Sequence, residues 1–360
     1  MSTIDKLTIQ NFRNITAATL EFSATINAFY GKNGAGKTTV LEAMHYLSLG
    51  RSFRTNHAQH IIKHGTNQFA VFAYLLKNDL RIPIGIEKSI MGQGQIRING
   101  ETISTLSSLV KQLPTQFISA MSYRFFFNGP KVRRQFLDWL LFHVEQSFFA
   151  EWQLFQRALK QRNASIKARV PAKQIALWDE ELIRSGSQID VLRKHSLTEF
   201  EPIFIGLLKQ LLPNYPIQLS YFRGWNKEKT FELALQHSLE RDLQFGFTQT
   251  GPQRADIKLL IDGIPAQDVL SQGQQKLTLY AFHLAQGTML KEKLGKGPIY
   301  LIDDVTSELD QQKQACISNV LTEIDSQVFI TGVSKKDFER MFDFNQVKMF
   351  HVEQGGVTPQ

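Results

Sequence analysis

The feature that most constrains this chain is a glycine-rich octapeptide near its start. Residues 31–38 read GKNGAGKT, which fits the pattern G-x-x-x-x-G-K-[ST] of a phosphate-binding loop. An apolar run, ATINAFY, precedes it at 24–30, and TTVLEAMHYLSL follows at 38–49 with apolar residues at helical spacing. A strand, a tight loop and a helix in this order predict a P-loop nucleotide site at the end of a buried strand.

The residues of this loop suit a triphosphate for separate physical reasons. Glycines let the backbone approach phosphate oxygens without a Cβ in the way, and the helix start directs N–H groups at the anion. We expect Lys37 to reach the β- and γ-phosphates, Thr38 to offer its hydroxyl to Mg²⁺ and Thr39 to bond the α-phosphate side. The residues expected to hold ATP are Gly31, Lys32, Asn33, Gly34, Ala35, Gly36, Lys37, Thr38 and Thr39.

An acidic pair ends a second apolar run, IYLID at 299–303. Such a run predicts a parallel strand buried on both faces, and such strands present ligand-binding groups at their carboxyl ends. We expect Asp303 to hold Mg²⁺, mainly through water, and Asp304 to orient or deprotonate the attacking water. Many ATPases of this sort carry glutamate at the second position. Aspartate is one methylene shorter, so slow hydrolysis is predicted.

The segment LSQGQQK at 270–276 indicates that the ATPase works as a pair of molecules. Ser271 is a candidate helix cap, Gly273 lets the backbone approach an anion, and Gln274 lies in the first turn of the helix, whose start is a second phosphate-binding end. Since the P-loop already binds the γ-phosphate, this second end is best explained as binding ATP held on another copy. A two-fold homodimer would then enclose two ATP molecules, with SELD at 307–310 along the same interface.

Positive charge is concentrated in one part of the chain. The net charge is +8, yet residues 122–173 carry 10 Lys/Arg against 3 Asp/Glu, while residues 174–360 carry 19 against 24. A local basic excess attracts a phosphate backbone, although charge runs are also common on solvated helical faces. The candidate DNA contacts are Arg51, Arg54, Arg133 and Arg134, of which the first two are also candidates for the γ-phosphate. Arg13, in NFRN, is a candidate for the nucleotide itself.

Composition places the chain in the cytoplasm. A single cysteine, Cys316, forms no internal disulfide and fits a reducing compartment. No apolar run approaches the ~20 residues needed to cross a bilayer, and the first residues lack a signal-peptide pattern. We therefore expect a cytoplasmic, nucleoid-associated protein with no membrane partner.

Over nearly its whole length the chain resembles the RecF family, a bacterial relative of SMC-type and ABC-type ATPases. Besides the ATPase motifs, the resemblance rests on LTIQNFRNI (7–15), GRSFRT (50–55), GPKVRRQFLDW (129–139), LSYFRGW (219–225) and TGPQRAD (250–256). It implies ATP-dependent binding of duplex, gapped or junction DNA, dimerisation on ATP and weak DNA-stimulated ATP hydrolysis. It also implies single-stranded DNA binding, roles in recombination, DNA repair, replication and the SOS response, and partnership with the RecO and RecR mediators that load RecA.

The chain departs from the family pattern at two places. The family usually carries Pro-Glu shortly before GPxxRR, where a water-positioning residue is expected, and here Ala120 and Met121 stand there, with Gln116 as a weak substitute. In TGPQRAD, Gln253 replaces a common histidine, and the residues give no role for Arg254.

The motif order predicts a split domain. Two long helical patterns, near 145–168 and 173–211, lie between the phosphate loop and the later motifs. We therefore expect an α/β fold: a P-loop ABC-type ATPase head with a mixed sheet and flanking helices, formed by 1–121 and 213–360. Residues 122–212 would form an inserted helical arm, like a shortened coiled coil. Short strands are expected near 7–12, 19–22, 71–76, 82–88 and 95–100, the last in an Asn-Gly hairpin.

Two other function classes remain open from the sequence. A transporter ATPase subunit would carry the same nucleotide motifs, although the basic arm counts against it. A non-hydrolysing scaffold would use bound ATP only to hold two copies together.

Overall fold

The computed structural model describes residues 2–55, 57–77, 79–119, 122, 124–127, 129–306 and 309–360. It divides into two compact units: unit 1 comprises Met1–Ser122 with Lys276–Gln360, and unit 2 comprises Tyr123–Gln275. The positions of the missing Pro-Glu pair, Ala120 and Met121, lie outside the described residues, as do Ser307 and Glu308 of the SELD segment.

A mostly parallel sheet carries the ATPase motifs in unit 1. Its strand order is β15-β14-β3-β13-β12-β8, and the β14–β15 pair alone is antiparallel among its described strands. Strands β12 and β13 are buried along their whole length, which explains why both read as continuous apolar runs. The strands are β3 (Ile26–Tyr30), β8 (Thr115–Ile118), β12 (Ile299–Ile302), β13 (Val328–Gly332), β14 (Val347–Glu353) and β15 (Gly356–Pro359).

An antiparallel sheet forms the second layer of unit 1, in the order β2-β1-β4-β5-β6-β7. Strand β4 alternates buried and partly buried residues, as expected where one face of a sheet is covered. Positive φ angles at Asn99 (53°) and Gly100 (85°) form the predicted hairpin turn between β6 and β7. The strands are β1 (Ser2–Phe12), β2 (Ile15–Glu21), β4 (Gln68–Lys77), β5 (Leu80–Ser89), β6 (Gly94–Ile98) and β7 (Glu101–Thr102).

Helix α1 (Lys37–Leu49) lies between the two sheets of unit 1, because it contacts strands of both. Nearly all of its residues are buried, so the helix that begins at the phosphate loop is also the centre of the core. It ends at Gly50, whose φ of 65° allows its N–H to bond the Tyr46 carbonyl. The other helices lying wholly in unit 1 are α2 (Leu106–Gln112), α11 (Gln311–Glu323) and α12 (Lys335–Met341), with single turns at Ala58–His60 and Phe344–Gln346.

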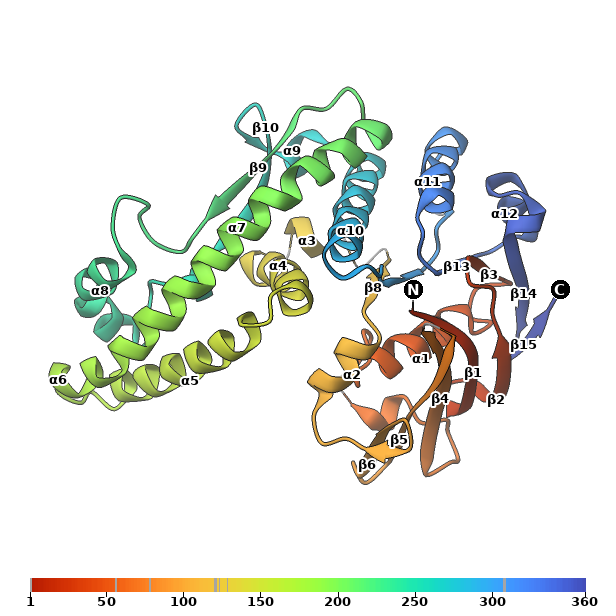
Figure 1. The fold of residues 1–360 in the computed structure, drawn as a ribbon, viewed down its shortest axis with the longest axis horizontal. Coiled ribbons are helices and arrows are strands. Elements are labelled where there is room, and N and C mark those ends of the chain that lie inside the picture. Colours follow the sequence, from red (N-terminus) through yellow and green to blue (C-terminus); the bar gives the residue numbers. More distant parts are fainter. Residues whose placement is uncertain are drawn as a thin grey trace. The chain divides into compact units, whose positions relative to one another are not determined.

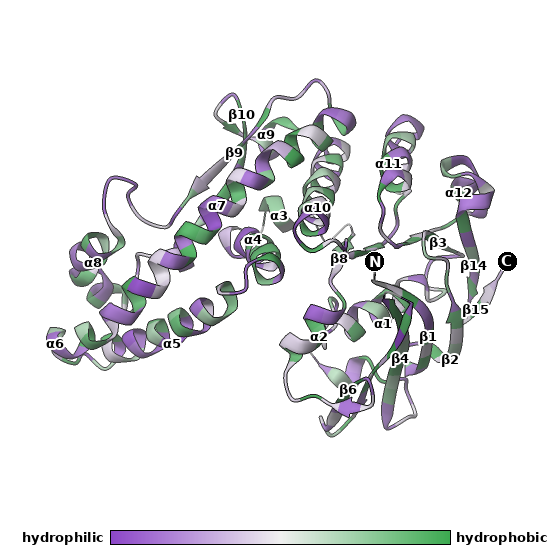
Figure 2. Ribbon diagram, viewed as in Figure 1, coloured by the Kyte–Doolittle hydropathy of each residue, from purple (hydrophilic) through white to green (hydrophobic). Residues whose placement is uncertain are grey.

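Unit 2 is built on the two long helices that the sequence predicts, α5 (Phe148–Lys167) and α7 (Asp179–Leu211), which pack against each other (Figure 1). Along α7 hydrophobic and hydrophilic colours alternate, as expected for a helix with one buried face (Figure 2). Its other helices are α3 (Arg124–Phe127), α4 (Pro130–Val144), α6 (Ala172–Ile175), α8 (Phe231–Phe245) and α9 (Ala266–Val269), with turns at Ala176–Trp178 and Pro252–Arg254.

The arm is larger than the sequence predicts. Residues 213–275 group with unit 2, whereas the motif spacing assigned them to the head. The physical reason is that α8 packs on α5 and α7, and that an antiparallel sheet, β11-β10-β9, packs through β10 on α4. These strands are β9 (Ile217–Phe222), β10 (Asp256–Ile261) and β11 (Ile264–Pro265). Helix α10 (Gln272–Leu294) begins in unit 2 and continues into unit 1.

Candidate functional site

The phosphate loop joins β3 to α1, as predicted, and its glycines are required by their surroundings. Gly34 and Gly36 have φ angles of 79° and 119°, which side chains with a Cβ rarely adopt. A Cβ on Gly31 would lie 2.1 Å from the Val352 carbonyl oxygen on β14. A Cβ on Gly36 would lie 2.9 Å from the amide nitrogen of Asn14. The loop therefore fits closely between its neighbours.

The Lys37 ammonium lies inside this loop. It donates to the backbone carbonyls of Gly31 at 2.7 Å and Lys32 at 3.0 Å. Burial lowers the pKa of Lys37, while the nearby carboxylates of Asp304 and Asp303 act in the opposite direction. The cation is thus held by carbonyl oxygens of the loop, with two aspartates close enough to stabilise its charge.

The acidic strand end meets the phosphate loop within unit 1. The Thr38 hydroxyl donates to the Asp303 carboxylate at 2.8 Å, and Thr331, at the end of β13, donates to the same oxygen at 2.7 Å. The Thr331 hydroxyl also accepts the Asp304 N–H at 2.7 Å. Asp304 has a φ of 55°, a conformation that non-glycine residues seldom adopt outside sites that need it. Two motifs more than 250 residues apart therefore form one site.

Thr331 is a site residue that sequence reasoning missed. The signal was present, because VFITG is an apolar run that ends in a hydroxyl side chain. Only the pairing of β13 beside β12 shows that this hydroxyl reaches the aspartates.

A pocket gathers most of these groups. Its walls combine backbone donors, one ammonium, hydroxyls and carboxylates, which is the chemistry that a metal-bound phosphate requires. The lining residues are Asn33, Gly34, Gly36, Lys37, Thr38, Thr39, Arg54, Asp303, Asp304 and Thr331. Gly31, Lys32 and Ala35 lie behind this lining, where their carbonyls accept hydrogen bonds.

The donor set fits Mg²⁺. Thr38 and Asp303 supply two hard oxygens 2.8 Å apart, and Mg²⁺ is usually held by one or two protein oxygens together with water and substrate phosphates. No group of three or more His, Cys, Asp or Glu able to hold a metal occurs among the described residues. A metal here would therefore depend on water and phosphate oxygens for the rest of its ligands.

Asn14 fixes the back of the loop. Its amide nitrogen donates to the Ala35 carbonyl at 3.1 Å, and its amide oxygen accepts the Thr39 hydroxyl at 3.0 Å. We expected this hydroxyl to turn to the α-phosphate side. In the structure it is directed to Asn14, although Thr39 still lines the pocket.

A buried carboxylate organises the arginines near the pocket. Glu42, on α1, has no exposed side-chain surface and accepts two hydrogen bonds from Arg13, at 2.6 and 3.1 Å, and one from Ser52 at 2.5 Å. Arg54 lies 3.5 Å from the same carboxylate and lines the pocket. Arg13 is not among the lining residues, and its guanidinium is held in this ion pair. Arg51 is exposed on the same loop.

The start of α10 has the capping arrangement that the sequence predicts. The Ser271 hydroxyl accepts the Gln274 N–H at 3.4 Å, and the Gln274 side chain accepts the Ser271 N–H at 2.8 Å. The Gln274 amide nitrogen also donates to the Tyr215 hydroxyl at 2.5 Å. Ser271 is exposed and Gly273 is partly exposed, so this helix start is accessible in unit 2.

The candidate DNA arginines of α4 have structural partners instead. Arg133 is only 13% exposed and forms a two-pronged ion pair with Asp256 on β10, at 2.6 and 2.9 Å. Arg134 donates to the Ala255 carbonyl at 2.7 Å, and burial lowers its pKa. Arg133 thereby links α4 to β10, and Arg134 links α4 to Ala255, the residue that precedes β10.

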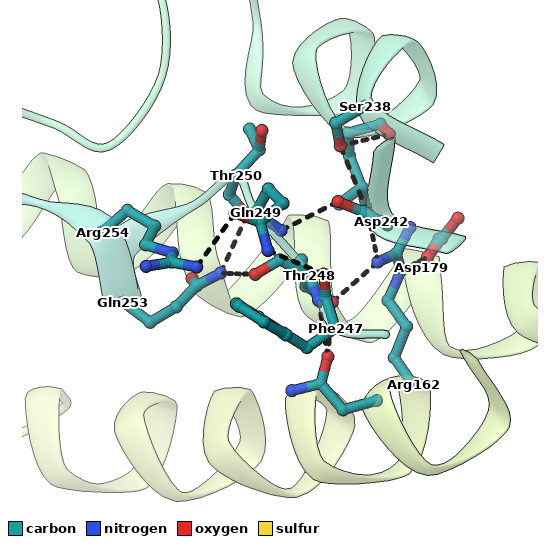
Figure 3. Close-up of polar contacts among 12 residues, drawn as sticks. Arg162, Asp179, Ser238, Asp242, Phe247, Thr248, Gln249, Thr250, Gln253 and Arg254 are labelled. Atoms are coloured by element: carbon teal, nitrogen blue, oxygen red, sulfur yellow. Dashed lines mark hydrogen bonds and ion pairs between the residues drawn. The ribbon is translucent and has the colours of Figure 1, made fainter. Parts of the chain in front are cut away.

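The TGPQRAD segment belongs to a polar network around Arg162 (Figure 3). Arg162, with no exposed side-chain surface, pairs with Asp179 and Asp242, each at 2.7 Å. Asp242 in turn accepts the Gln249 N–H at 2.8 Å. Arg254 donates to the Gln249 side chain at 3.1 Å and lies 5.0 Å from the centre of the Phe247 ring. Gln253 caps the turn by donating to the carbonyls of Thr248 and Thr250.

Gln116, the weak substitute for a water-positioning residue, lies in the core rather than in the pocket. Its amide donates to Gln286 at 2.8 Å, and its oxygen contacts the His283 ring nitrogen at 2.8 Å. Burial lowers the pKa of His283 to about 4, so this histidine is neutral near pH 7. The side chain supports the packing of β8 on α10.

Known proteins agree with this architecture. The family model described as RecF/RecN/SMC N terminal domain matches residues 3–358. The DNA replication and repair protein RecF of Coxiella burnetii (strain CbuK_Q154) is 48% identical, over 99% of each chain. The chain belongs to the RecF family. A second RecF, from Shewanella loihica (strain ATCC BAA-1088 / PV-4), is 38% identical over 99% of each chain.

Solved structures support the same fold. The "Structure of the recombination mediator protein RecF-ATPrS in RecFOR pathway" has a TM-score of 0.87 at 26% identity, covering 99% of this RecF-family chain and 98% of its own. An SMC head bound to the C-winged helix domain of ScpA has a TM-score of 0.62 at 17% identity, covering 99% and 96%, and shows the fold alone. The predicted α/β fold of a P-loop ABC-type ATPase head is thereby confirmed. Among the residues that the structure describes, no helix is both long and apolar enough to cross a bilayer.

Proposed function

We propose that this chain is an ATP-dependent DNA-binding protein of recombinational repair and replication-gap processing. In this proposal it hydrolyses ATP slowly and uses ATP binding to pair two copies around duplex or junction DNA. The observation that carries the proposal is the convergence of the Thr38 and Thr331 hydroxyls on one oxygen of the Asp303 carboxylate near Lys37, in a chain of the RecF family. Membership of this family favours DNA repair over a transporter ATPase.

The phosphate loop would bind the triphosphate through its backbone N–H groups and Lys37. The Lys37 ammonium, now on the carbonyls of Gly31 and Lys32, is a mobile point charge that reaches phosphate oxygens by rotating its side chain. Asn33, Gly34 and Gly36 offer the adjoining walls. Asn14 keeps the loop in this shape through its bonds to Ala35 and Thr39.

Thr38 and Asp303 would hold Mg²⁺, which when bound neutralises charge on the phosphate oxygens. Thr331 keeps the Asp303 carboxylate in place and also accepts the Asp304 N–H. Asp304 would orient the attacking water, and its constrained backbone sets the direction of its short side chain. A short acid in this role is consistent with slow turnover that serves as a switch.

The exposed start of α10 would complete the site of a second copy. Ser271 is exposed and Gly273 partly exposed at this end of the helix, and a helix start attracts a phosphate. The capping bonds between Ser271 and Gln274 make this end rigid before any partner arrives. Each ATP in a two-fold dimer would then touch both copies.

DNA is the proposed macromolecular partner. The printed names of the relatives describe DNA replication and repair proteins, and those of the solved structures a recombination mediator in the RecFOR pathway. The exposed arginines Arg51 and Arg54 remain candidates for DNA or γ-phosphate contact, since Arg54 already lines the pocket. Arg133 and Arg134 are not part of this proposal, because their guanidinium groups hold α4 to β10. RecR, RecO and RecA are the partners that the family suggests, in a cytoplasmic setting.

Sedimentation with and without ATP, repeated with gapped DNA, tests the proposal. Lys37→Met should abolish ATP binding and ATP-driven dimerisation, because Lys37 is the lysine among the described residues that line the pocket. Asp304→Asn should instead retain ATP binding and trap the dimer, because water is no longer activated. A monomeric Asp304→Asn protein at saturating ATP would contradict the dimer mechanism. Phosphate release over many turnovers by the wild type would exclude a non-hydrolysing scaffold.

A further inference from the structure

The last two strands of the chain, β14 and β15, form a hairpin at the edge of the sheet that carries the ATPase motifs (Figure 1). Its turn consists of Gln354 and Gly355, whose φ angles of 47° and 81° are those of a two-residue hairpin turn. Strand β14 pairs in parallel with β3, and His351 lies opposite Tyr30, the residue that precedes the phosphate loop. The turn that follows β14 therefore lies near this loop, although the two are close to opposite ends of the chain.

A backbone hydrogen bond joins this turn to the phosphate loop. The Gly355 N–H donates to the Ala35 carbonyl at 2.8 Å, and the Asn14 side-chain amide donates to the same carbonyl at 3.1 Å. Gly355 is buried, which shields the bond from water. One carbonyl of the loop is thus held by donors from both ends of the chain.

The orientation of one peptide group follows from these two bonds. In a trans peptide the C=O and N–H point in opposite directions, so the fixed Ala35 carbonyl also fixes the N–H of Gly36. Gly36 lines the nucleotide pocket, and its N–H has no acceptor among the residues that the structure describes. The hairpin therefore keeps a backbone donor of the loop available for an anion.

The contact leaves no room for a side chain on the turn. A Cβ on Gly355 would lie 2.2 Å from the Asn14 backbone oxygen, so the turn or Asn14 would have to move. Gly100 and Gly263 occupy the same place in two other hairpin turns, with φ angles of 85° and 80°, but a Cβ there would meet no atom within 4 Å. A side chain would strain the backbone at all three glycines, whereas at Gly355 it would also collide with the support of the phosphate loop.

We propose that Gly355 is a positioning residue for the bound nucleotide. Through the Ala35 carbonyl, the β14–β15 turn holds the Ala35–Gly36 peptide in the orientation that binds a phosphate oxygen. Displacing the hairpin therefore weakens nucleotide binding, although Gly355 is not among the residues that line the pocket. The inference rests on the proposed nucleotide site and extends it to the end of the chain, and it depends on neither dimerisation nor DNA.

Binding of MgADP to the full-length protein tests the proposal. ADP has no γ-phosphate, so its affinity does not depend on the proposed contact with a second copy. In Gly355→Ala the dissociation constant, measured by isothermal titration calorimetry, should rise at least ~10-fold, because the misoriented Gly36 N–H loses a hydrogen bond to a charged group. The matched control is Gly100→Ala, which has similar backbone strain in a hairpin of the same unit and should change the constant less than ~2-fold. Equal dissociation constants for the two variants would overturn the proposal.

Thermal unfolding separates positioning from stability. Both glycine variants should lower the unfolding midpoint of the ligand-free protein, because both force a Cβ into a left-handed conformation. At one fixed concentration, MgADP should raise the midpoint less in Gly355→Ala than in Gly100→Ala, since stabilisation by a ligand follows its affinity. A turn with a purely structural role would leave that rise unchanged, and this result would contradict the proposal.

Hydrogen exchange on the wild type provides a measurement that needs no variant. MgADP should slow exchange of the Gly355 amide at least ~5-fold, because its acceptor lies on the peptide that the nucleotide orders. Exchange at Gly100 should stay the same. An unchanged rate at Gly355 would show that the hairpin and the phosphate loop are not coupled.

The outcomes distinguish this role from the proposed dimer. If Gly355→Ala loses ADP affinity while the wild type stays monomeric with saturating ATP, the ATP-driven clamp fails and the positioning role stands. If both glycine variants bind ADP as the wild type does, and ATP still pairs two copies, the positioning role fails and the clamp stands.

Discussion

Arginine side chains have different roles in the two units, and the difference follows from how deeply each side chain is buried. In unit 1, Arg54 is 44% exposed, lies 3.5 Å from Glu42 and lines the nucleotide pocket. In unit 2, Arg162 has no exposed side-chain surface and holds Asp179 and Asp242 together. An exposed guanidinium near one carboxylate can still exchange partners. A buried guanidinium cannot, because its carboxylate partner would remain buried with an uncompensated charge. A basic motif therefore indicates ligand binding only where the structure leaves the charge accessible.

The largest expected effect is the loss of the buried arginine. Arg162→Ala should lower the free energy of unfolding by ~3–5 kcal/mol, because the fully buried Asp242 carboxylate would lose its charged partner. Urea denaturation followed by circular dichroism measures this change. Arg157→Ala, an exposed arginine on the same helix, should alter stability by less than ~0.5 kcal/mol. Equal effects of the two variants would remove the contrast between buried and exposed arginines.

Low pH should reduce the free energy of unfolding of unit 1, because two of its histidines are buried. Burial lowers the pKa of both His45 and His283 to about 4, well below the value of ~6.5 for an unfolded chain. The folded state binds fewer protons, so the contribution of each histidine is complete above pH ~6.5 and is lost as pH falls toward 4. Each loss amounts to about 2–3 kcal/mol.

His283→Gln provides the measurement. From pH 7 to about pH 4.5, the free energy of unfolding should decline less steeply for this variant than for the wild type, because glutamine does not titrate. Carboxylates titrate in both proteins and cancel in the difference. Parallel declines would show that His283 is not buried in its neutral form.

Thr331 allows the nucleotide site to be separated from general stability. Thr331→Val should reduce ATP hydrolysis ~10–100-fold and raise the Mg²⁺ concentration needed for half-maximal rate, because Asp303 loses the hydroxyl that orients it. A steady-state phosphate-release assay at varied Mg²⁺ measures both changes. Thr322→Val, which removes a hydroxyl bonded only within α11, is the matched control. If both variants hydrolyse ATP equally well, Thr331 is not a positioning residue.

The smallest expected effect concerns the back of the phosphate loop. Asn14→Ala removes two hydrogen bonds, to Ala35 and from Thr39, and should weaken ATP binding ~3- to 10-fold. Isothermal titration calorimetry with ATP gives this affinity directly. Arg13→Ala should weaken ATP binding less than Asn14→Ala does, because Arg13 pairs with Glu42 outside the pocket. Its main effect should be a lower free energy of unfolding. A larger affinity loss in Arg13→Ala than in Asn14→Ala would restore Arg13 as a nucleotide contact.

Local signals were enough for the nucleotide motifs. The strand before the phosphate loop, α1 after it and the buried β12 all occur where the apolar pattern placed them. Such elements can be predicted from the sequence because one short segment both carries the apolar pattern of the strand or helix and contains the ligand-binding group. The two long arm helices were readable for a similar reason, since their periodic apolar faces extend over many turns.

Other features needed the folded chain. The extension of unit 2 to residue 275 depends on α8 and β10 packing on helices far away in sequence. Thr331 joins the site only because β13 pairs beside β12. Arg133 and Arg134 were predicted as DNA contacts because the sequence shows their charge. It does not show that the Asp256 carboxylate and the Ala255 carbonyl, more than 100 residues away, bind these guanidinium groups.

The amino-acid order alone thus determined which atoms are offered to a phosphate: loop N–H groups, Lys37, Thr38 and the two aspartates after β12. The tertiary structure decided which charges remain available, by pairing Arg13 with Glu42 and Arg162 with Asp242 while leaving Arg54 exposed. The reason is physical. A binding motif such as the phosphate loop consists of residues that are adjacent in the chain. The free energy of a charge instead depends on the solvent and counter-charges around it, which only the packed structure supplies.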